Sequence, residues 1–385
     1  MGTTKSCAGG CGICDSCVAR AKFLEERRLK SGVSRFSGLL YIIFIIILVA
    51  LTKWIHGESV QIAFMGDINL TSDIAESIDA HGLDWSFEKV QPYLDGVDFR
   101  VANLESPAGE GGARYCPKTY YFEAKPKYLD VLTHAHMDLV SLANNHCLDY
   151  GPNVILQTER ELDSRGIRHM GIVHSSSEEN QPVVVKIKGQ TFGFLAYCNV
   201  CPEEFAPGKS TAGVSVGTYS LVAKQIRQLR PKVDYLIVFP HWGTEYFAAD
   251  KNQKKLGQIM LDAGADVVVG CHPHVLQQIV KPDDGHVIAY SLGNFLFPMH
   301  WQVALDSTIL RLTFDRVDGK NIVKVNHIDV ALNSHRPVPL TAYVMENERN
   351  SRDVYILEKG YQYNNNRRWP SEPPWQHQNI AGLFP

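Results

Sequence analysis

The sequence predicts an α/β sandwich with some antiparallel strands. Short apolar runs rich in β-branched residues alternate with segments of helical spacing, a pattern typical of strands joined through helices. Near the end, two apolar runs at 308–314 and 322–330 are separated by a short polar stretch, which indicates a closing antiparallel pair. The chain has 385 residues, of which 45% are hydrophobic and 21% charged, enough for one large core.

The individual elements follow from local periodicity and from glycine and proline positions. Strands are expected at 60–65, 99–104, 139–143, 183–187, 191–197, 235–239, 267–270 and 287–291. Helices are expected at 74–80, 127–137, 154–163, 220–229 and 253–263. The glycine turn at 188–190 predicts a hairpin, and the Pro- and Gly-containing stretch 202–213 predicts a loop over the site.

A long uncharged segment lies before these elements. Residues 36–52 carry no charge, and continuing to residue 55 approaches the ~20 residues that a membrane helix needs. Lys and Arg residues concentrate before this segment, and only Lys53 follows it closely. The positive-inside rule therefore predicts a single transmembrane signal anchor at 36–55, a cytosolic tail at 1–35 and an extracellular main domain. A cleaved signal peptide and a buried core helix are the alternatives.

The two ends of the chain have distinct compositions. The predicted cytosolic tail holds four cysteines that could bind zinc or an iron–sulfur cluster, or remain reduced or acylated. They are Cys7, Cys11, Cys14 and Cys17. The main domain is predicted at 60–345, and the polar, proline-rich residues 346–385 predict a poorly packed tail. The net charge of −3 excludes a generally basic, nucleic-acid-binding protein.

Polar residues of the types that bind metals follow several of the apolar runs. They are Asp67, Glu105, Asn145, His241, His272 and His274. In α/β sheets, functional sites form beyond the carboxyl ends of the strands. One such residue is more often a turn or capping residue, but six at equivalent positions predict a shared site. Carboxylate, amide and imidazole groups suit zinc, manganese or iron, and His146 beside Asn145 could protonate a leaving group.

Six sequence blocks resemble the poly-γ-glutamate capsule-synthesis (CapA-type) family. They are GDINL at 66–70, NLESP at 103–107, ANNHCLDYG at 143–151, HWGTEY at 241–246, GADVVVGCHPHVLQ at 264–277 and YSLGNFLF at 290–297. The resemblance runs from about residue 60 to 315, with the blocks in the expected order. This family is in turn similar to the calcineurin-like metallophosphoesterases. The resemblance therefore implies a metallophosphoesterase-like β-sandwich flanked by helices, with two divalent metal ions.

The resemblance also implies roles for individual residues. Asp67, Glu105 and His274 would hold one metal, and Glu105 would bridge to a second metal held by Asn145, His241 and His272. His146 would be the general acid or oxyanion contact. Two positions depart from the phosphoesterase pattern, since Asn69 replaces a histidine as a metal ligand and Glu105 replaces an aspartate.

Three further polar residues near these positions are expected to support the ligands. Asn103 lies in the same block as Glu105 and is an alternative metal contact there. Asp149 and Glu245 could orient ligand imidazoles or act as capping residues. Asn294 and Ser291 are interpreted as loop-shaping.

The resemblance leaves three functions open. The first is an extracellular, membrane-anchored protein of poly-γ-glutamate synthesis or export, working on an anionic polymer together with membrane-embedded partners. The second is a metal-dependent phosphoesterase acting on a small or lipid-linked phosphate. The third is a polymer-binding subunit without catalytic activity. Whether the chain is an enzyme is therefore left open.

Overall fold

The computed structural model describes residues 20, 22–27, 40–45 and 58–340. The chain divides into two units, Met1–Gly57 and Glu58–Pro385. Of the predicted anchor at 36–55, only residues 40–45 are described, and they are helical. The four cysteines of the predicted tail and residues 346–385 lie outside the described residues. Within the described part, no helix is long and apolar enough to cross a bilayer.

The first sheet of the main unit is mixed. Its strand order is β16 (Arg336–Pro339), β15 (Lys320–Asn333), β14 (Asp306–Val317), β1 (Val60–Ile68), β2 (Phe99–Leu104), β3 (Leu139–Ser141), β4 (Arg168–Met170), and β13 (Asn294–Leu296) pairs with β1. The strands from β1 to β4 are parallel, whereas β14, β15 and β16 continue the sheet in antiparallel fashion. The predicted antiparallel pair near the end is therefore confirmed, with longer strands than expected.

The second sheet has a parallel centre and antiparallel edges. Its order is β11 (Ile279–Val280), β12 (Val287–Ala289), β10 (Val267–Val269), β9 (Tyr235–His241), β7 (Gln190–Cys198), β6 (Val183–Ile187). The edge strands β11 and β6 are antiparallel to their neighbours, and β6–β7 is the predicted hairpin. A separate pair joins β5 (Ile172–Val173) and β8 (Gly213–Val214).

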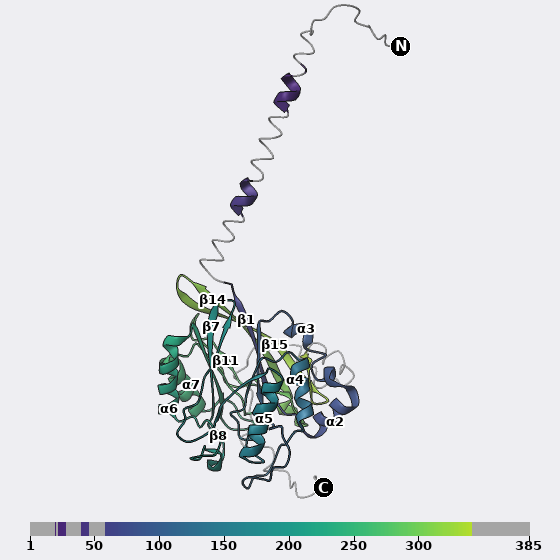
Figure 1. Ribbon diagram of the computed structural model, residues 1–385, viewed down its shortest axis with the longest axis vertical. Coiled ribbons are helices and arrows are strands. Elements are labelled where there is room, and N and C mark those ends of the chain that lie inside the picture. The colour runs from purple at the N-terminus through teal and green to yellow at the C-terminus, as the bar shows by residue number, and fades with distance from the viewer. Residues whose placement is uncertain (1–19, 21, 28–39, 46–57, 341–385) are drawn as a thin grey trace, which may run out of the picture. The chain divides into compact units, whose positions relative to one another are not determined.

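The two sheets face each other across one apolar core. The ring of Phe314 on β14 lies 5.1 Å from Phe192 on β7 and 4.9 Å from Tyr235 on β9, measured between centroids. Helices cover the outer faces (Figure 1). The helices α6 (Tyr219–Leu229) and α7 (Lys251–Ala263) share a core cluster with one sheet. The helices α2 (Ser72–His81), α4 (Asp130–His134) and α5 (Pro152–Ser164) lie on the side of the other. The predicted α/β architecture is thus confirmed.

Short elements account for most of the differences from prediction. The strands β4, β5, β8, β11, β13 and β16 were not predicted, and each has only two to four residues. The helix expected at 127–137 is instead a 3₁₀ turn, η2 (Pro126–Leu129), followed by the short α4. A left-handed backbone at His136 (φ 50°) explains its early end, since helices do not continue through such a residue.

Tight backbone contacts bring the carboxyl ends of the strands together. A Cβ at Gly66 would lie 1.8 Å from the carbonyl oxygen of Gly293, so only glycine lets β1 approach the segment before β13. A Cβ at Gly270 would lie 2.2 Å from the carbonyl oxygen of Tyr290. These two glycines explain why the motif aspartate and histidines follow glycine in the sequence.

Candidate functional site

The predicted strand-end residues converge at one edge of the sandwich. We call Asp67, Glu105, Asn145, His241, His272 and His274 the strand-end cluster. The cluster contains two groups of three residues, and within each group the ligand atoms all lie within 4.8 Å of one another. One group is Glu105, His272 and His274, and the other is Asp67, Glu105 and His241. These five side chains are buried. Glu105 belongs to both groups, as it does in the metal-ligand assignment that the resemblance implies. The histidines are divided between the two groups differently than in that assignment.

The two carboxylates are held by an amide donor from β2. The Nδ2 of Asn103 donates to Oδ1 of Asp67 at 2.8 Å and to Oε2 of Glu105 at 3.4 Å. The Oδ1 of Asn103 accepts from Nδ2 of Asn144 at 3.2 Å. Asn103 therefore presents its donor side to both carboxylates, and the structure places it as their support.

Each of two histidines has an amide partner that orients its ring. His241 is the last residue of β9, and its Nε2 lies 2.9 Å from Oδ1 of Asn145. His274 Nδ1 lies 2.8 Å from Oδ1 of Asn294 on β13, which leaves Nε2 on the side of Glu105, 3.7 Å from Oε1. Asn294 is thus more than the loop-shaping residue that the sequence suggested, because it sets the direction of a candidate ligand.

The backbone around the histidines is strained. His272 and His274 both have positive φ, at 97° and 56°. A left-handed conformation costs a non-glycine residue roughly 1–2 kcal/mol. Strain of this kind persists where the surrounding structure fixes it, and it concentrates at functional sites. The fold holds both imidazoles at this edge in spite of that cost.

Burial disfavours the charged forms of four residues in the strand-end cluster. Burial raises the pKa of Asp67 and raises that of Glu105 well above its usual range, with the nearby charge of Asp67 adding to the shift at Glu105. Burial also lowers the pKa values of His241 and His272 well below the ordinary imidazole range. These two imidazoles are therefore neutral, which is the form that binds metals.

The donor set fits a divalent metal ion. Two buried donor atoms, Oε1 of Glu105 and Nδ1 of His272, have no hydrogen-bond partner within the described structure. Buried polar atoms usually have one, so such exceptions require an explanation. Carboxylate and imidazole donors suit zinc, manganese and iron, and a cation would neutralise two adjacent carboxylates. Asp67, Glu105, His241, His272 and His274 would hold it.

A second trio lies beside the strand-end cluster and includes a lysine that sequence analysis missed. His146 Nδ1 lies 2.6 Å from Oδ2 of Asp149, and Lys118 Nζ donates to the other oxygen of Asp149 at 2.5 Å. Lys118 also donates to the carbonyl oxygen of Asn145. The ring of Phe122 lies 4.2 Å from that of His146. Asp149 thus orients His146, and Lys118 joins this pair to the strand-end cluster.

Burial lowers the pKa of His146 to about 4. The ring is therefore neutral at neutral pH. With Nδ1 directed at Asp149, its Nε2 is the atom that remains for proton exchange.

We expect Lys118→Met to destabilise the fold strongly. Asp149 is fully buried (0% exposed side chain) and Lys118 nearly so (13%), so the substitution leaves a buried carboxylate without its ammonium partner. Removing one partner of a buried pair costs about 3–5 kcal/mol. Urea unfolding of the purified protein measures the loss. The matched control is Lys127→Met, whose pair with Asp79 is exposed (55% and 52%) and should change stability little. Equal losses for both variants would contradict this assignment.

Asn69 and Glu245 were predicted near the metal ligands, and the structure gives each a different surrounding. The Oδ1 of Asn69 accepts from the backbone N–H and the hydroxyl of Thr71 at 3.0 and 2.7 Å, and its Nδ2 is buried without a partner in the described structure. Its oxygen therefore already shapes the start of α2. Glu245 is half-buried, and its charge helps to raise the pKa of Glu105. Its effect on the strand-end cluster is electrostatic.

Two residues of the site, Lys118 and Asn144, were not predicted, and only one of them was marked by a sequence motif. Lys118 lies in the long segment between β2 and η2, where no periodic pattern or motif marks it. Asn144 immediately precedes a predicted ligand, and its Nδ2 donates to the carbonyl oxygen of Leu104 at 2.8 Å, joining β2 to the loop after β3. Its place inside the 143–151 block was the available signal.

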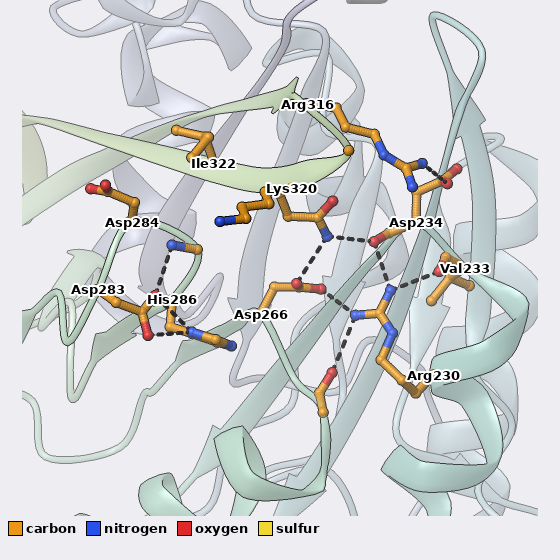
Figure 2. A pocket seen from close by; sticks show the side chains of 14 residues that line it. Arg230, Val233, Asp234, Asp266, Asp283, Asp284, His286, Arg316, Lys320 and Ile322 are labelled. Atoms are coloured by element: carbon orange, nitrogen blue, oxygen red, sulfur yellow. Dashed lines mark hydrogen bonds and ion pairs between the residues drawn. The ribbon is translucent and has the colours of Figure 1, made fainter.

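A separate cavity of ≈ 800 Å³ does not include the predicted site. Several of its charged groups pair with one another (Figure 2). Arg230 pairs with Asp266 at 2.5 Å and donates to the carbonyl oxygens of Val233 and Asp234, and Asn321 donates to Asp266 at 3.1 Å. Asp234 and Asp266 precede β9 and β10, so this network ties the amino ends of those strands to the β14–β15 turn.

Comparison with known proteins gives consistent matches. The model of the family described as bacterial capsule synthesis protein PGA_cap matches residues 61–299. The PGA biosynthesis protein CapA of Bacillus subtilis (strain 168) is 30% identical over 290 residues, covering 74% of this chain and 76% of that protein. The capsule biosynthesis protein CapA of Bacillus anthracis is 28% identical over 298 residues, covering 75% and 72%.

Solved structures give a weaker match. The calcineurin-like phosphoesterase YfkN from Bacillus subtilis is similar over 78% of this chain and 99% of that chain, with 12% sequence identity and a TM-score of 0.45. A similarity at this level does not identify an activity.

Proposed function

This chain belongs to the PGA_cap family of bacterial capsule synthesis proteins, and from that membership we propose that it acts in the synthesis or export of a poly-γ-glutamate capsule through a metal centre formed by the strand-end cluster. The observation that carries the proposal is the extent of the family match. It spans residues 61–299, and this range contains every residue of the strand-end cluster as well as Lys118, His146 and Asp149. The part of the chain shared with the family is therefore the part that forms the site.

The proposed chemistry assigns separate tasks to the residues of the site. Divalent ions bound by such donors polarise a substrate oxygen and neutralise anionic charge. The cation is held by Asp67, Glu105, His241, His272 and His274. Hydrogen bonds with Asn103 and Asn294 orient the donor groups of these ligands. His146 takes or gives a proton at Nε2, since Asp149 fixes its Nδ1. The ammonium of Lys118 adds positive charge beside the site, which suits an anionic polymer.

We place the main domain outside the cell, anchored by residues 36–55 with the N-terminus in the cytosol. The charge asymmetry around this segment supports the orientation. An extracellular domain has no ready supply of ATP, so the role proposed here is export, anchoring, trimming or transfer of the polymer beside membrane-embedded partners. A reporter fused after Pro385 would be active only outside the cytosol, and cytosolic activity would contradict the orientation.

A metal-dependent phosphoesterase is the second candidate function. The specific observation in its favour is the combination of a carboxylate–imidazole donor set with a lysine ammonium beside His146. Such a site would bind a phosphoester as readily as a carboxylate polymer.

The functional test is complementation in a capsule-forming bacterium that lacks its own member of the family. We expect the wild-type chain to restore extracellular poly-γ-glutamate and the His272→Ala, His274→Ala double variant to restore none at equal protein level. Purified wild-type protein is assayed in parallel on a generic phosphoester. Polymer restored equally by both proteins would contradict the proposed role of the site, and phosphoester turnover without polymer would favour the second candidate.

A further inference from the structure

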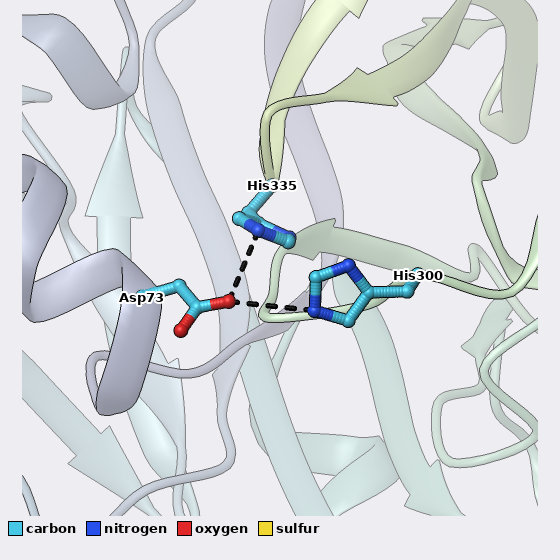
Figure 3. Close-up of side chains that lie close together, drawn as sticks. All are labelled: Asp73, His300 and His335. Carbon is cyan, nitrogen blue, oxygen red and sulfur yellow. Dashed lines mark ion pairs between the residues drawn. The ribbon is translucent and has the colours of Figure 1, made fainter. Parts of the chain in front are cut away.

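A second group of metal-type side chains lies outside the strand-end cluster. It consists of Asp73, His300 and His335, which we call the Asp73 group (Figure 3). The Oδ2 of Asp73 lies 3.4 Å from Nε2 of His300 and 3.2 Å from Nε2 of His335. The three ligand atoms all lie within 4.8 Å of one another. They come from segments far apart in the sequence, and all three side chains point to a common centre.

Each residue of the group is placed by a different element. Asp73 is in the first turn of α2, and His300 lies in the loop between β13 and the 3₁₀ helix η5 (Gln302–Ala304). His335 occupies the two-residue turn between β15 and β16, where both Ser334 and His335 have positive φ, at 50° and 68°. Such turns favour asparagine and glycine. Backbone strain of this kind concentrates at functional sites.

The distances favour a cation over a simple hydrogen-bonded trio. An N–H···O bond is usually 2.7–3.2 Å long, and the two contacts of Asp73 are at or beyond the upper limit. Ligand atoms of a tetrahedral zinc with bonds of ~2.0–2.1 Å lie roughly 3.3 Å apart. The two distances from Asp73 to the histidines match that edge. The Nε2 of His335 is the nitrogen that faces Asp73.

We propose that Asp73, His300 and His335 form a second metal site for a zinc-class divalent cation, which fixes the loop between β13 and η5 beside the strand-end cluster. Two imidazoles and one carboxylate are a common donor set for such ions. The side chain of His300 is 73% exposed, so the ion reaches the site from solvent and retains a position for water. The proposal does not depend on a metal in the strand-end cluster.

The loop that carries His300 packs directly on the strand-end cluster before that residue, and through Tyr246 after it. The ring of Phe297 lies 5.0 Å from that of His274. The ring of Trp301 lies 5.0 Å from that of Tyr246, which in turn lies 5.8 Å from His274. A cation that joins His300 to α2 and to the β15–β16 turn would therefore reduce the freedom of residues that pack on a candidate ligand.

Zinc binding to the purified full-length chain tests the site. Wild type, His300→Ala, Asp73→Asn and the control His327→Ala are dialysed with Zn²⁺, then against metal-free buffer, and the retained zinc is counted. His327 is also an exposed histidine beside a carboxylate, 3.6 Å from Asp329 on β15. We expect His300→Ala and Asp73→Asn to retain one equivalent less than both wild type and control. Equal zinc in all four proteins overturns the proposal.

Two further measurements separate this site from the strand-end cluster. In the His272→Ala, His274→Ala background, the equivalent assigned to the Asp73 group should persist and should again be lost with His300→Ala. If that equivalent is already lost when only His272 and His274 are replaced, the assignment is overturned. Zinc should also change the fluorescence of Trp301. The zinc-dependent change should be present in wild type and absent in both Trp301→Phe and His300→Ala. Zinc binding without that change would overturn the effect on the loop.

Discussion

Glu105→Gln should abolish metal binding in the strand-end cluster without weakening the metal-free fold. Glu105 belongs to both groups of ligand atoms, and an amide offers one acceptor oxygen where the carboxylate offers two. In the metal-free protein, burial raises the pKa of Glu105 well above its usual range. An acid whose pKa is raised on folding reduces stability once the pH exceeds its unfolded pKa. Removing that charge should therefore leave the metal-free protein at least as stable at neutral pH.

The measurement is thermal unfolding with and without added Mn²⁺ or Zn²⁺. A ligand at 1,000 times its Kd stabilises the native state by about 4 kcal/mol. Wild type should show a stabilisation of this order, and Glu105→Gln should lose the share that comes from the strand-end cluster. Glu88→Gln is the control, because Glu88 is an exposed residue near Arg336 and should behave as wild type. A metal-induced shift of wild-type size in Glu105→Gln would contradict the ligand assignment.

His146→Ala should have the opposite signature, with metal retained and function lost. Its Nδ1 is bound to Asp149, and its imidazole is neutral at neutral pH, so its proposed task is proton transfer. A positioned acid or base typically contributes on the order of 10²–10⁴ in rate. We expect a loss of this size in turnover of the anionic substrate, and loss of extracellular polymer in complemented cells.

The matched control for His146→Ala is His134→Ala. His134 also pairs with an aspartate, Asp84 at 3.0 Å, but on the surface. It should keep both metal and function. If His146→Ala retains full polymer production at wild-type protein level, proton transfer by this residue is excluded.

The long elements of the fold could be predicted because their patterns are strong. The strand at 99–104 has the bounds expected for it, and the bounds of α5, α6 and α7 differ from their predicted ranges by at most two residues at either end. The short strands β4, β5, β8, β11, β13 and β16 were missed, because two to four residues carry too little periodicity, whereas β3, β10 and β12, with three residues each, lie within the longer runs that were expected to be strands. β13 is the important case. It consists of Asn294–Leu296, and its pairing with β1 brings Asn294 to His274.

The strand-end cluster was visible from sequence because parallel strands bring their carboxyl ends together. That rule requires only the apolar run and the polar residue after it, and it identified Asp67, Glu105 and His241. Lys118 was not predicted, because its position depends on how an irregular segment folds back onto Asp149, and no local sequence pattern specifies that path. His300 and His335 escaped for the same reason. Each lies in a loop or turn, and only the tertiary fold places them beside Asp73.

The most direct test of the central claim is a metal count on a chain that lacks the Asp73 group. Purified full-length protein carrying His300→Ala and His335→Ala is analysed for bound transition metal, alone and with His272→Ala and His274→Ala added. The proposed metal centre predicts at least one equivalent in the first protein and none in the second, with both folded. An absence of metal from the first protein after loading with Mn²⁺, Zn²⁺ or Fe²⁺, or equal metal in both, would show that the strand-end cluster is structural.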